Sequence, residues 1–142
     1  MSAMVFVYGT LKQGFPNFCL NTGERVEGVY RTRLAYPLYL VGSRYSPWLI
    51  NDPGAGSRVA GEVYRVADEG LATMDELERI RHVDGYRRES IEVIQTRTNT
   101  LMEMYAYLKE PGQLQPDTIR AGPLASYEAH HARLYRQRRH GQ

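Results

Sequence analysis

A short apolar run that stops abruptly at a glycine is the feature that most constrains how this chain can fold. Residues 4–8 are all apolar or aromatic, Gly9 ends the run, and a second glycine follows at Gly14. The pattern predicts a buried strand that leads into a glycine-bounded loop. Because glycine tolerates positive φ and the close approach of another molecule, such a loop can point several backbone N–H groups at one anion. The stretch is therefore either a small anion or carboxylate site at a strand end or an ordinary tight turn.

The loop lacks the residues that nucleotide-binding loops require. After Gly9 there is no Lys-Ser/Thr pair as in a P-loop, and the third glycine of a dinucleotide-binding turn is missing. The formal net charge of the chain is only +2, which is too small to indicate a nucleic-acid partner. The arginines near the C-terminus would suit nucleic acid or an acidic partner, but a solvated chain end explains them better. They are Arg133, Arg136, Arg138 and Arg139.

Length and composition predict one globular domain over residues 1–142, in which 111–142 form an irregular or partly helical C-terminal extension. Hydrophobic residues make up 42% and charged residues 24% of the chain, as in proteins that bury a core. No apolar run approaches the roughly 20 residues of a membrane span, and the start lacks a signal-peptide pattern. Cys19 is the single cysteine, so we expect no internal disulfide, a reducing cytoplasmic setting, and a place for Cys19 in the core.

Apolar or alternating segments predict several strands. These segments are residues 4–8, 25–32, 36–41, 59–66, 87–96 and 101–108, with the last two joined as a hairpin by a turn at 97–100. A short apolar segment at 45–50 is followed by a loop rich in glycine and proline at 51–57.

Residues 68–79 form the one helix that the sequence marks clearly. Asp68 is a good N-cap, and Leu71, Met74 and Leu77 recur at helical spacing to give an apolar face. Many strands and one well-marked helix predict an α+β fold. We expect a small mixed or antiparallel β-barrel packed against one main α-helix.

A cluster of acids lies at the end of this helix. Successive residues on a helix are about 100° apart, so Glu78 borders the apolar face, Asp75 shares that side, and Glu76 lies toward solvent. Burial and the negative end of the helix dipole predict a raised pKa for Glu78. A raised pKa suits a carboxyl group that exchanges protons near neutrality. The alternative is an ordinary solvated acidic face.

The histidines offer weaker signals. His82 and the three histidines of the tail give no Ser-His-Asp order. His130 and His131 are adjacent, so on any helix their side chains should point apart, which argues against a metal pair. The sequence therefore predicts no metal site.

Several short motifs occur together in this chain. They are Val-Phe-Val-Tyr-Gly-Thr-Leu-Lys-Gln-Gly-Phe-Pro-Asn at 5–17, Ser-Pro-Trp-Leu at 46–49, Gly-Glu-Val-Tyr at 61–64, Met-Asp-Glu-Leu-Glu at 74–78 and Gly-Tyr-Arg-Arg at 85–88. With them the chain resembles the gamma-glutamylcyclotransferase superfamily (the AIG2-like group), and within it the gamma-glutamylamine cyclotransferase branch. The resemblance covers residues 4–108 and carries little of the tail from 111 onward.

The resemblance implies a small barrel of mixed strands with a helix that carries an acid. It implies that the backbone amides of Gly9, Thr10 and Leu11 hold the carboxylate of a gamma-glutamyl group. It also implies that Glu78, the last acid of the Asp-Glu-Leu-Glu run, is the general acid/base.

The same resemblance implies further substrate contacts and a reaction. Tyr86 would lie beside the substrate, and Tyr8 and Trp48 would be walls of the pocket. A gamma-glutamylamine such as gamma-glutamyl-ε-lysine would be converted to 5-oxoproline and the free amine. Because the substrate's own α-amine is the nucleophile, no cofactor or metal is required.

Two alternatives stay open at this point. The same reaction could act on gamma-glutamyl amino acids or on another gamma-glutamyl conjugate. The chain could also be a non-catalytic protein of the same fold that binds a small molecule. In each case the expected partner is a small molecule, with neither nucleic acid nor a membrane.

Overall fold

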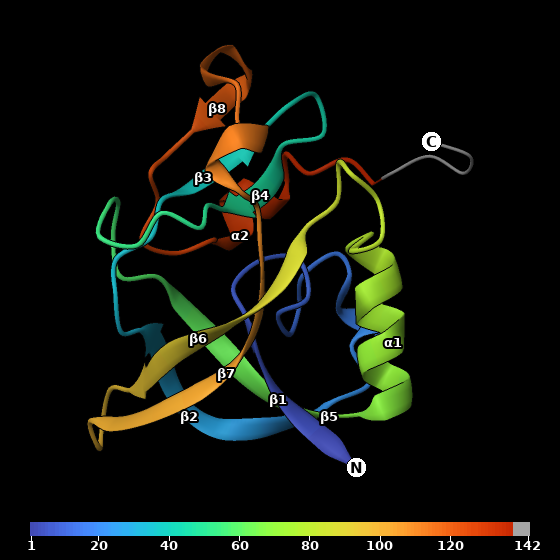
Figure 1. Cartoon of the computed structure of the whole chain (residues 1–142), viewed down its shortest axis with the longest axis vertical. Helices are drawn as coiled ribbons and strands as arrows, with labels where there is room; N and C mark the ends of the chain where they lie inside the picture. Colours follow the sequence, from blue (N-terminus) through green and yellow to red (C-terminus); the bar gives the residue numbers. More distant parts are fainter. Residues whose placement is uncertain (138–142) are drawn as a thin grey trace.

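The computed structural model describes residues 1–137 and consists of a closed barrel with a smaller sheet beside it (Figure 1). The barrel has the strand order β1-β5-β2-β6-β7. Its strands are β1 (Ser2–Val7), β2 (Glu24–Thr32), β5 (Ala60–Ala67), β6 (Arg87–Gln95) and β7 (Thr100–Leu108). The smaller sheet has the order β4-β3-β8, with β3 (Leu38–Val41), β4 (Ser46–Leu49) and β8 (Ile119–Ala121). The expected α+β barrel with one main helix is confirmed.

The first strand closes the barrel. β1 pairs antiparallel with β5 and parallel with β7, through Val5 and Tyr105. Its two faces are both buried: Phe6 and Tyr8 point into the barrel, whereas Val5 and Val7 belong to a second apolar cluster under the helix. A strand covered on both faces needs apolar residues at every position, which explains the continuous run that the sequence shows.

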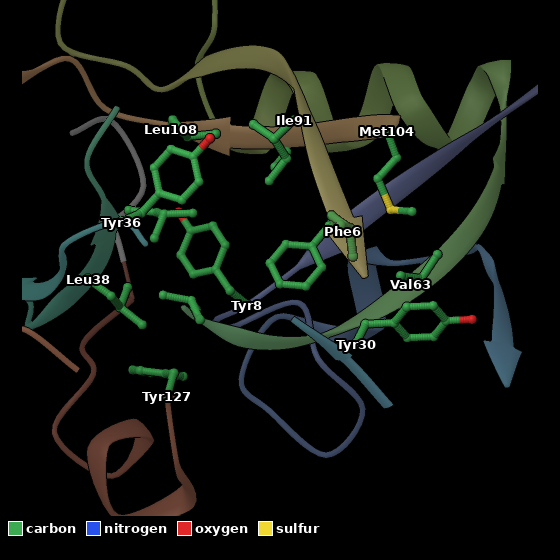
Figure 2. Packing of buried hydrophobic residues seen from close by; sticks show 14 of the residues in the cluster. Phe6, Tyr8, Tyr30, Tyr36, Leu38, Val63, Ile91, Met104, Leu108 and Tyr127 are labelled. Atoms are coloured by element: carbon green, nitrogen blue, oxygen red, sulfur yellow. The ribbon is translucent and has the colours of Figure 1, made fainter. Parts of the chain in front are cut away.

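The barrel interior is a packed core (Figure 2). Among its members Phe6, Leu38, Val63 and Leu108 have no exposed surface, and Tyr30 is 2% exposed. Ring and branched side chains from strands far apart in sequence fill the space between them. This close-packed interior leaves the strand ends at the rim as the place where a small molecule can bind.

The main helix, α1 (Asp68–Leu77), packs against β1 and β5 and lies along one side of the barrel in Figure 1. Asp68 is not its N-cap, which corrects the sequence prediction. The N-cap is Ala67 in extended conformation, and no side chain caps the helix. Asp68 instead lies 3.8 Å from the N-terminal amine.

The helix also ends two residues earlier than predicted, at Leu77. Arg79 has φ 56°, a left-handed conformation that stops the helix. The Arg79 N–H donates to the Glu76 carbonyl at 3.1 Å, and the Ile80 N–H donates to the Asp75 carbonyl at 3.2 Å. These two bonds form a Schellman motif, which usually carries glycine at the left-handed position. The motif encloses Glu78, the residue before the left-handed Arg79, and so fixes the Glu78 backbone.

The segment after β7 contributes to both the core and the small sheet. It contains η2 (Pro111–Gln113), η3 (Pro116–Thr118), β8 and α2 (Ala129–Ala132), and Tyr127 within it is fully buried. The helix predicted within the tail is therefore confined to α2, while residues 138–142 lie outside the described part of the chain. No helix within residues 1–137 has the length and apolar character to cross a membrane.

Two minor predictions are wrong. Cys19, expected in the core, is exposed in η1 (Phe18–Leu20). The rings of His130 and His131, expected to point apart, have centroids 3.9 Å apart because the His131 ring turns back to accept a hydrogen bond from the Glu128 N–H. Within residues 1–137 no group of three His, Cys, Asp or Glu side chains is arranged to hold a metal ion.

Candidate active site

A cavity of about 770 Å³ opens at the rim of the barrel, between β1, the end of α1 and the small sheet. All seven site residues that were predicted from the sequence line this cavity: Tyr8, Gly9, Thr10, Leu11, Trp48, Glu78 and Tyr86. The glycine-bounded loop and the acid at the helix end, almost seventy residues apart in sequence, therefore face one space. Its size suits a small organic molecule.

In the loop at 9–11 after β1, the backbone carbonyls accept hydrogen bonds whereas two backbone N–H groups are unused within the described residues, and we call it the polarised loop. The carbonyl oxygens of Gly9, Thr10 and Leu11 all accept hydrogen bonds from within the protein. The three donors are the Lys12 N–H (3.1 Å), the Asn17 N–H (2.8 Å) and the side-chain amide of Asn21 (3.1 Å). By contrast, no acceptor within residues 1–137 takes the backbone N–H of Thr10 or Leu11. A buried loop with used carbonyls and unused N–H groups is suited to an anion.

Side chains hold this loop in place. The Asn17 amide donates to Thr10 Oγ1 at 2.9 Å, and both residues are buried. The buried Lys12 ammonium donates to the Tyr127 carbonyl, which joins the loop to the C-terminal segment. Gly9 lies so close to β4 that a Cβ there would be 2.8 Å from Pro47 Cγ. Glycine at this position is required by space.

Glu78 is the C-cap of α1 and is half-buried. Its N–H donates to the Met74 carbonyl at 2.9 Å, and its own carbonyl accepts from the Tyr86 N–H at 2.9 Å. Its carboxylate lies near three tyrosine hydroxyls. Burial first, and then the charge of Glu78, raises the pKa of Tyr8; the same two causes contribute for Tyr86 and Tyr107.

The two predicted tyrosines are fixed as neutral walls. The Tyr8 hydroxyl donates to the Tyr107 carbonyl at 2.8 Å, and the Tyr86 hydroxyl donates to the Pro47 carbonyl at 2.8 Å. Burial is the main cause that raises the pKa of both phenols well above the ordinary value. Each hydroxyl proton is thus used within the protein, which leaves only oxygen lone pairs for a ligand.

Trp48 shares its side of the cavity with a lysine that the sequence analysis missed. Lys109 Nζ lies 4.2 Å from the Trp48 ring centroid and 4.6 Å from the Tyr86 ring centroid. It donates to the Asp84 carbonyl, and its side chain is 4% exposed. A charged residue directly after the apolar end of a strand, as Lys109 is after β7, was the signal that could have revealed it.

Asp75 is held away from the ligand space. Its carboxylate accepts from the Tyr107 hydroxyl at 2.6 Å and pairs with the Arg88 guanidinium. Glu76 is exposed, as predicted. Of the acids at the helix end, Glu78 is therefore the one that combines partial burial with a place beside the polarised loop.

Two further segments line the cavity, and in neither of them did the sequence analysis single out a site residue. Arg44, in the turn between β3 and β4, donates through Nη2 to the Tyr135 hydroxyl at 3.0 Å and through Nε to the Arg136 carbonyl at 3.0 Å. Asn17 also donates to the Tyr135 hydroxyl, at 3.3 Å. The C-terminal segment thus borders the cavity.

Comparison with known proteins places this chain in a family. Residues 5–129 match the family described as gamma-glutamyl cyclotransferase, AIG2-like. A gamma-glutamylaminecyclotransferase from Homo sapiens is 43% identical over 81 residues, covering 54% of this chain and 53% of that one. Gamma-glutamylaminecyclotransferase B from Danio rerio is 34% identical over 134 residues, covering 89% and 68%. The chain therefore spans about half the length of the human relative.

The solved structures agree. The crystal structure of an AIG2-like protein from Mus musculus superimposes with a TM-score of 0.79 and 28% identity, and it covers 96% of this chain and 97% of the other. The family match extends over most of the chain and includes both the loop after β1 and the end of α1. This protein is a member of the gamma-glutamyl cyclotransferase, AIG2-like family.

Proposed function

We propose that this protein is a cyclotransferase that converts a gamma-glutamylamine, such as gamma-glutamyl-ε-lysine, to 5-oxoproline and the free amine, with Glu78 as general acid/base. The observation that carries the proposal is that Glu78 and the polarised loop at 9–11 line one cavity. Relatives named gamma-glutamylaminecyclotransferase support the choice of substrate. The single cysteine, Cys19, is compatible with a cytoplasmic setting, which we propose as well.

The reaction is an intramolecular exchange of amides. The α-nitrogen of the gamma-glutamyl group attacks its own side-chain carbonyl carbon, and a new C–N bond closes the five-membered ring. The bond from that carbon to the leaving nitrogen then breaks. Atoms balance without water, metal or redox cofactor, because the nucleophile and the leaving group are both parts of the substrate.

Glu78 supplies the proton transfers in this scheme. The α-amine has an ordinary pKa of about 8 and is mostly an ammonium near neutrality, so it must lose a proton before it attacks. The Glu78 carboxylate accepts that proton and then returns it to the leaving nitrogen. Its half-buried position at the C-terminus of α1, in the lining of the cavity, places the carboxyl group where both steps would occur.

The loop and the tyrosines position the substrate. The unused N–H groups of Thr10 and Leu11 bind the α-carboxylate, and this folds the flexible chain so that the amine meets the carbonyl. Tyr8 and Tyr86 act as walls, since their hydroxyl protons are already donated to backbone carbonyls. Neither of these two hydroxyls therefore donates to the developing oxyanion.

The test is the release of 5-oxoproline from gamma-glutamyl-ε-lysine. The wild type should release it, and Glu78→Gln should not, because an amide cannot accept the ammonium proton. Glu69→Gln is the matched control: it neutralises an exposed acid on the same helix, and its activity should equal that of the wild type. Full activity of Glu78→Gln would overturn the role assigned to Glu78.

The same experiment separates the alternatives. A panel of gamma-glutamyl amino acids and other gamma-glutamyl conjugates identifies the preferred leaving group. If 5-oxoproline binds in a calorimeter but no gamma-glutamyl compound is turned over, the protein is a binding module that shares the fold, and the cyclotransferase proposal is wrong.

A further inference from the structure

The lining of the cavity carries a guanidinium, that of Arg44, in a fixed orientation. Arg44 Nε donates to the Arg136 carbonyl and Nη2 donates to the Tyr135 hydroxyl, each at 3.0 Å. The backbone reinforces this, because the Arg136 N–H donates to the Arg44 carbonyl at 2.9 Å. A planar guanidinium held at two of its nitrogens loses little freedom when it binds a ligand.

This orientation is tied to the loop that we propose holds the substrate. The Tyr135 hydroxyl accepts from the Asn17 side chain at 3.3 Å, and Asn17 donates to Thr10 Oγ1 at 2.9 Å. A continuous series of hydrogen-bonded groups thus runs along the cavity from Thr10 to Arg44. These bonds join the loop to Arg44.

The charge of Arg44 has no acidic counterpart in the described part of the chain. Its side-chain partners within residues 1–137 are a hydroxyl and a carbonyl, both neutral, and it belongs to no ion pair there. Nη1 has no hydrogen-bond partner among these residues and is not sealed from the surroundings. Since arginine stays protonated, a half-buried guanidinium that lines a cavity favours an anion.

Arg44 lines the part of the cavity that is available to the leaving amine. The charges of Glu78 and Arg44 both act on the Tyr86 hydroxyl. Burial is the main cause that raises the pKa of Tyr86, Tyr8 and then the Glu78 carboxylate raise it further, and Arg44 lowers it. Tyr86 and Arg44 line the same cavity as Glu78 and the loop, so the cavity has room for a leaving amine between Tyr86 and Arg44 when the gamma-glutamyl group lies between Glu78 and the loop.

We propose that Arg44, oriented by Tyr135, binds a carboxylate carried by the leaving amine, so that the protein prefers gamma-glutamylamines whose leaving amine carries a carboxylate, as lysine does, to those of simple amines. The inference rests on the proposed function and names the chemistry of its leaving group. Arg44 is the specificity-determining residue, and Tyr135 positions it.

Two ligands that differ by one carboxylate test the inference. They are gamma-glutamyl-ε-lysine and gamma-glutamylcadaverine, in which the leaving amine is the same chain without the carboxylate. Binding is measured by calorimetry at low temperature and turnover by 5-oxoproline release. The wild type should bind the lysine conjugate about tenfold more tightly, as expected for one charge-assisted contact. Arg44→Gln should bring the two dissociation constants together by weakening the lysine conjugate alone.

Matched variants keep the result interpretable. Arg97→Gln removes the same charge from an exposed turn outside the cavity and should keep the wild-type preference. Arg44→Lys keeps a charge without the planar fork and should retain part of the preference. If Arg44→Gln weakened the affinity for both ligands equally, Arg44 would instead hold the C-terminal segment or bind the α-carboxylate. That result would overturn the inference.

The remaining outcomes separate this inference from the proposed function. Turnover of both compounds with equal affinity overturns the role of Arg44 and leaves the cyclotransferase intact. A carboxylate preference that depends on Arg44 but comes without 5-oxoproline release supports the anion site and overturns the cyclotransferase. Absence of binding by either compound overturns the anion site.

Discussion

The backbone N–H of Tyr86 donates to the carbonyl oxygen of Glu78 across 2.9 Å. This bond closes the loop at 79–85 on itself and fixes the acid relative to a wall of the cavity. The Tyr86 hydroxyl extends the link, because it donates to the Pro47 carbonyl in β4. The backbone of the proposed acid/base is therefore held at both its N–H, which donates to the Met74 carbonyl, and its carbonyl oxygen. Catalysis requires this kind of preorganisation.

Gly85→Ala should disturb this arrangement directly. Gly85 is buried, and a Cβ there would lie 1.7 Å from the Arg79 carbonyl oxygen, so the loop must shift. A shift of about 1 Å at a catalytic group costs on the order of 100-fold in rate. We expect that loss in kcat for 5-oxoproline release, measured by steady-state kinetics on protein whose folded spectrum is unchanged.

Gly112→Ala is the control for this substitution. No atom lies within 4 Å of a Cβ at Gly112, which follows the barrel in η2. Its kinetics should match the wild type. If Gly85→Ala were as active as Gly112→Ala, the closed loop would not be what positions Glu78.

Gly9→Ala should weaken ligand binding through a clash with β4. The added Cβ would meet Pro47 Cγ at 2.8 Å, so the loop that presents the Thr10 and Leu11 N–H groups must move. We expect about tenfold weaker binding of 5-oxoproline by calorimetry, the loss of one good contact.

A double-mutant cycle identifies the cause of that loss. Pro47→Ala removes Cγ, so Gly9→Ala combined with Pro47→Ala should bind 5-oxoproline more tightly than Gly9→Ala alone. Strictly additive effects would show that the contact between Gly9 and Pro47 is not responsible.

Periodicity predicted much of the fold because burial follows secondary structure. The alternation around Tyr30 and Val63 and the spacing of Met74 predicted β2, β5 and α1 with small errors at their ends. The N-cap prediction failed because the chain leaves β5 in extended conformation through Ala67, which places Asp68 inside the helix.

The site could be predicted only in part. Gly9 and Glu78 are marked by local patterns, a broken apolar run and an acid at a helix edge. Arg44 and Tyr135 carry no such mark: one is in a turn, the other in the tail, and only the three-dimensional fold brings them together. Residues that meet through long-range packing leave no periodic signal in a single sequence.

Asp75→Asn should destabilise the fold. The carboxylate joins the Tyr107 hydroxyl to the Arg88 guanidinium, and its side chain is 20% exposed. Loss of the charge leaves a partly buried guanidinium without its partner, which we expect to cost about 1–3 kcal/mol in the free energy of unfolding. Denaturant titration measures this.

Asp68→Asn is the matched control for Asp75→Asn. Its carboxylate is 77% exposed, caps nothing and meets only an exposed N-terminal amine. No measurable change in the unfolding midpoint is expected. A loss equal to that of Asp75→Asn would mean that helix charge, and not the contacts of Asp75, sets the stability.

Because of the tyrosines in the site, we expect the free energy of unfolding to fall at alkaline pH. Burial, more than any other cause, raises the pKa of Tyr8, Tyr86 and Tyr107 in the folded state. A group with a raised folded-state pKa contributes stability that is fully present below its unfolded pKa, about 10, and lost above it. Each of these tyrosines should lower the free energy of unfolding by about 1.4 kcal/mol per pH unit there.

One buried group acts in the opposite direction. Burial lowers the pKa of Lys12, so its contribution to stability rises with pH until the unfolded lysine loses its proton. Three tyrosines outweigh one lysine, and the net slope above about pH 10 should be negative. Tyr107→Phe removes one titrating group, so its unfolding free energy, measured by urea titration at several pH values, should fall less steeply than that of the wild type. A wild-type curve that stays flat above about pH 10 would show that these phenols ionise as easily in the folded state as in the unfolded chain.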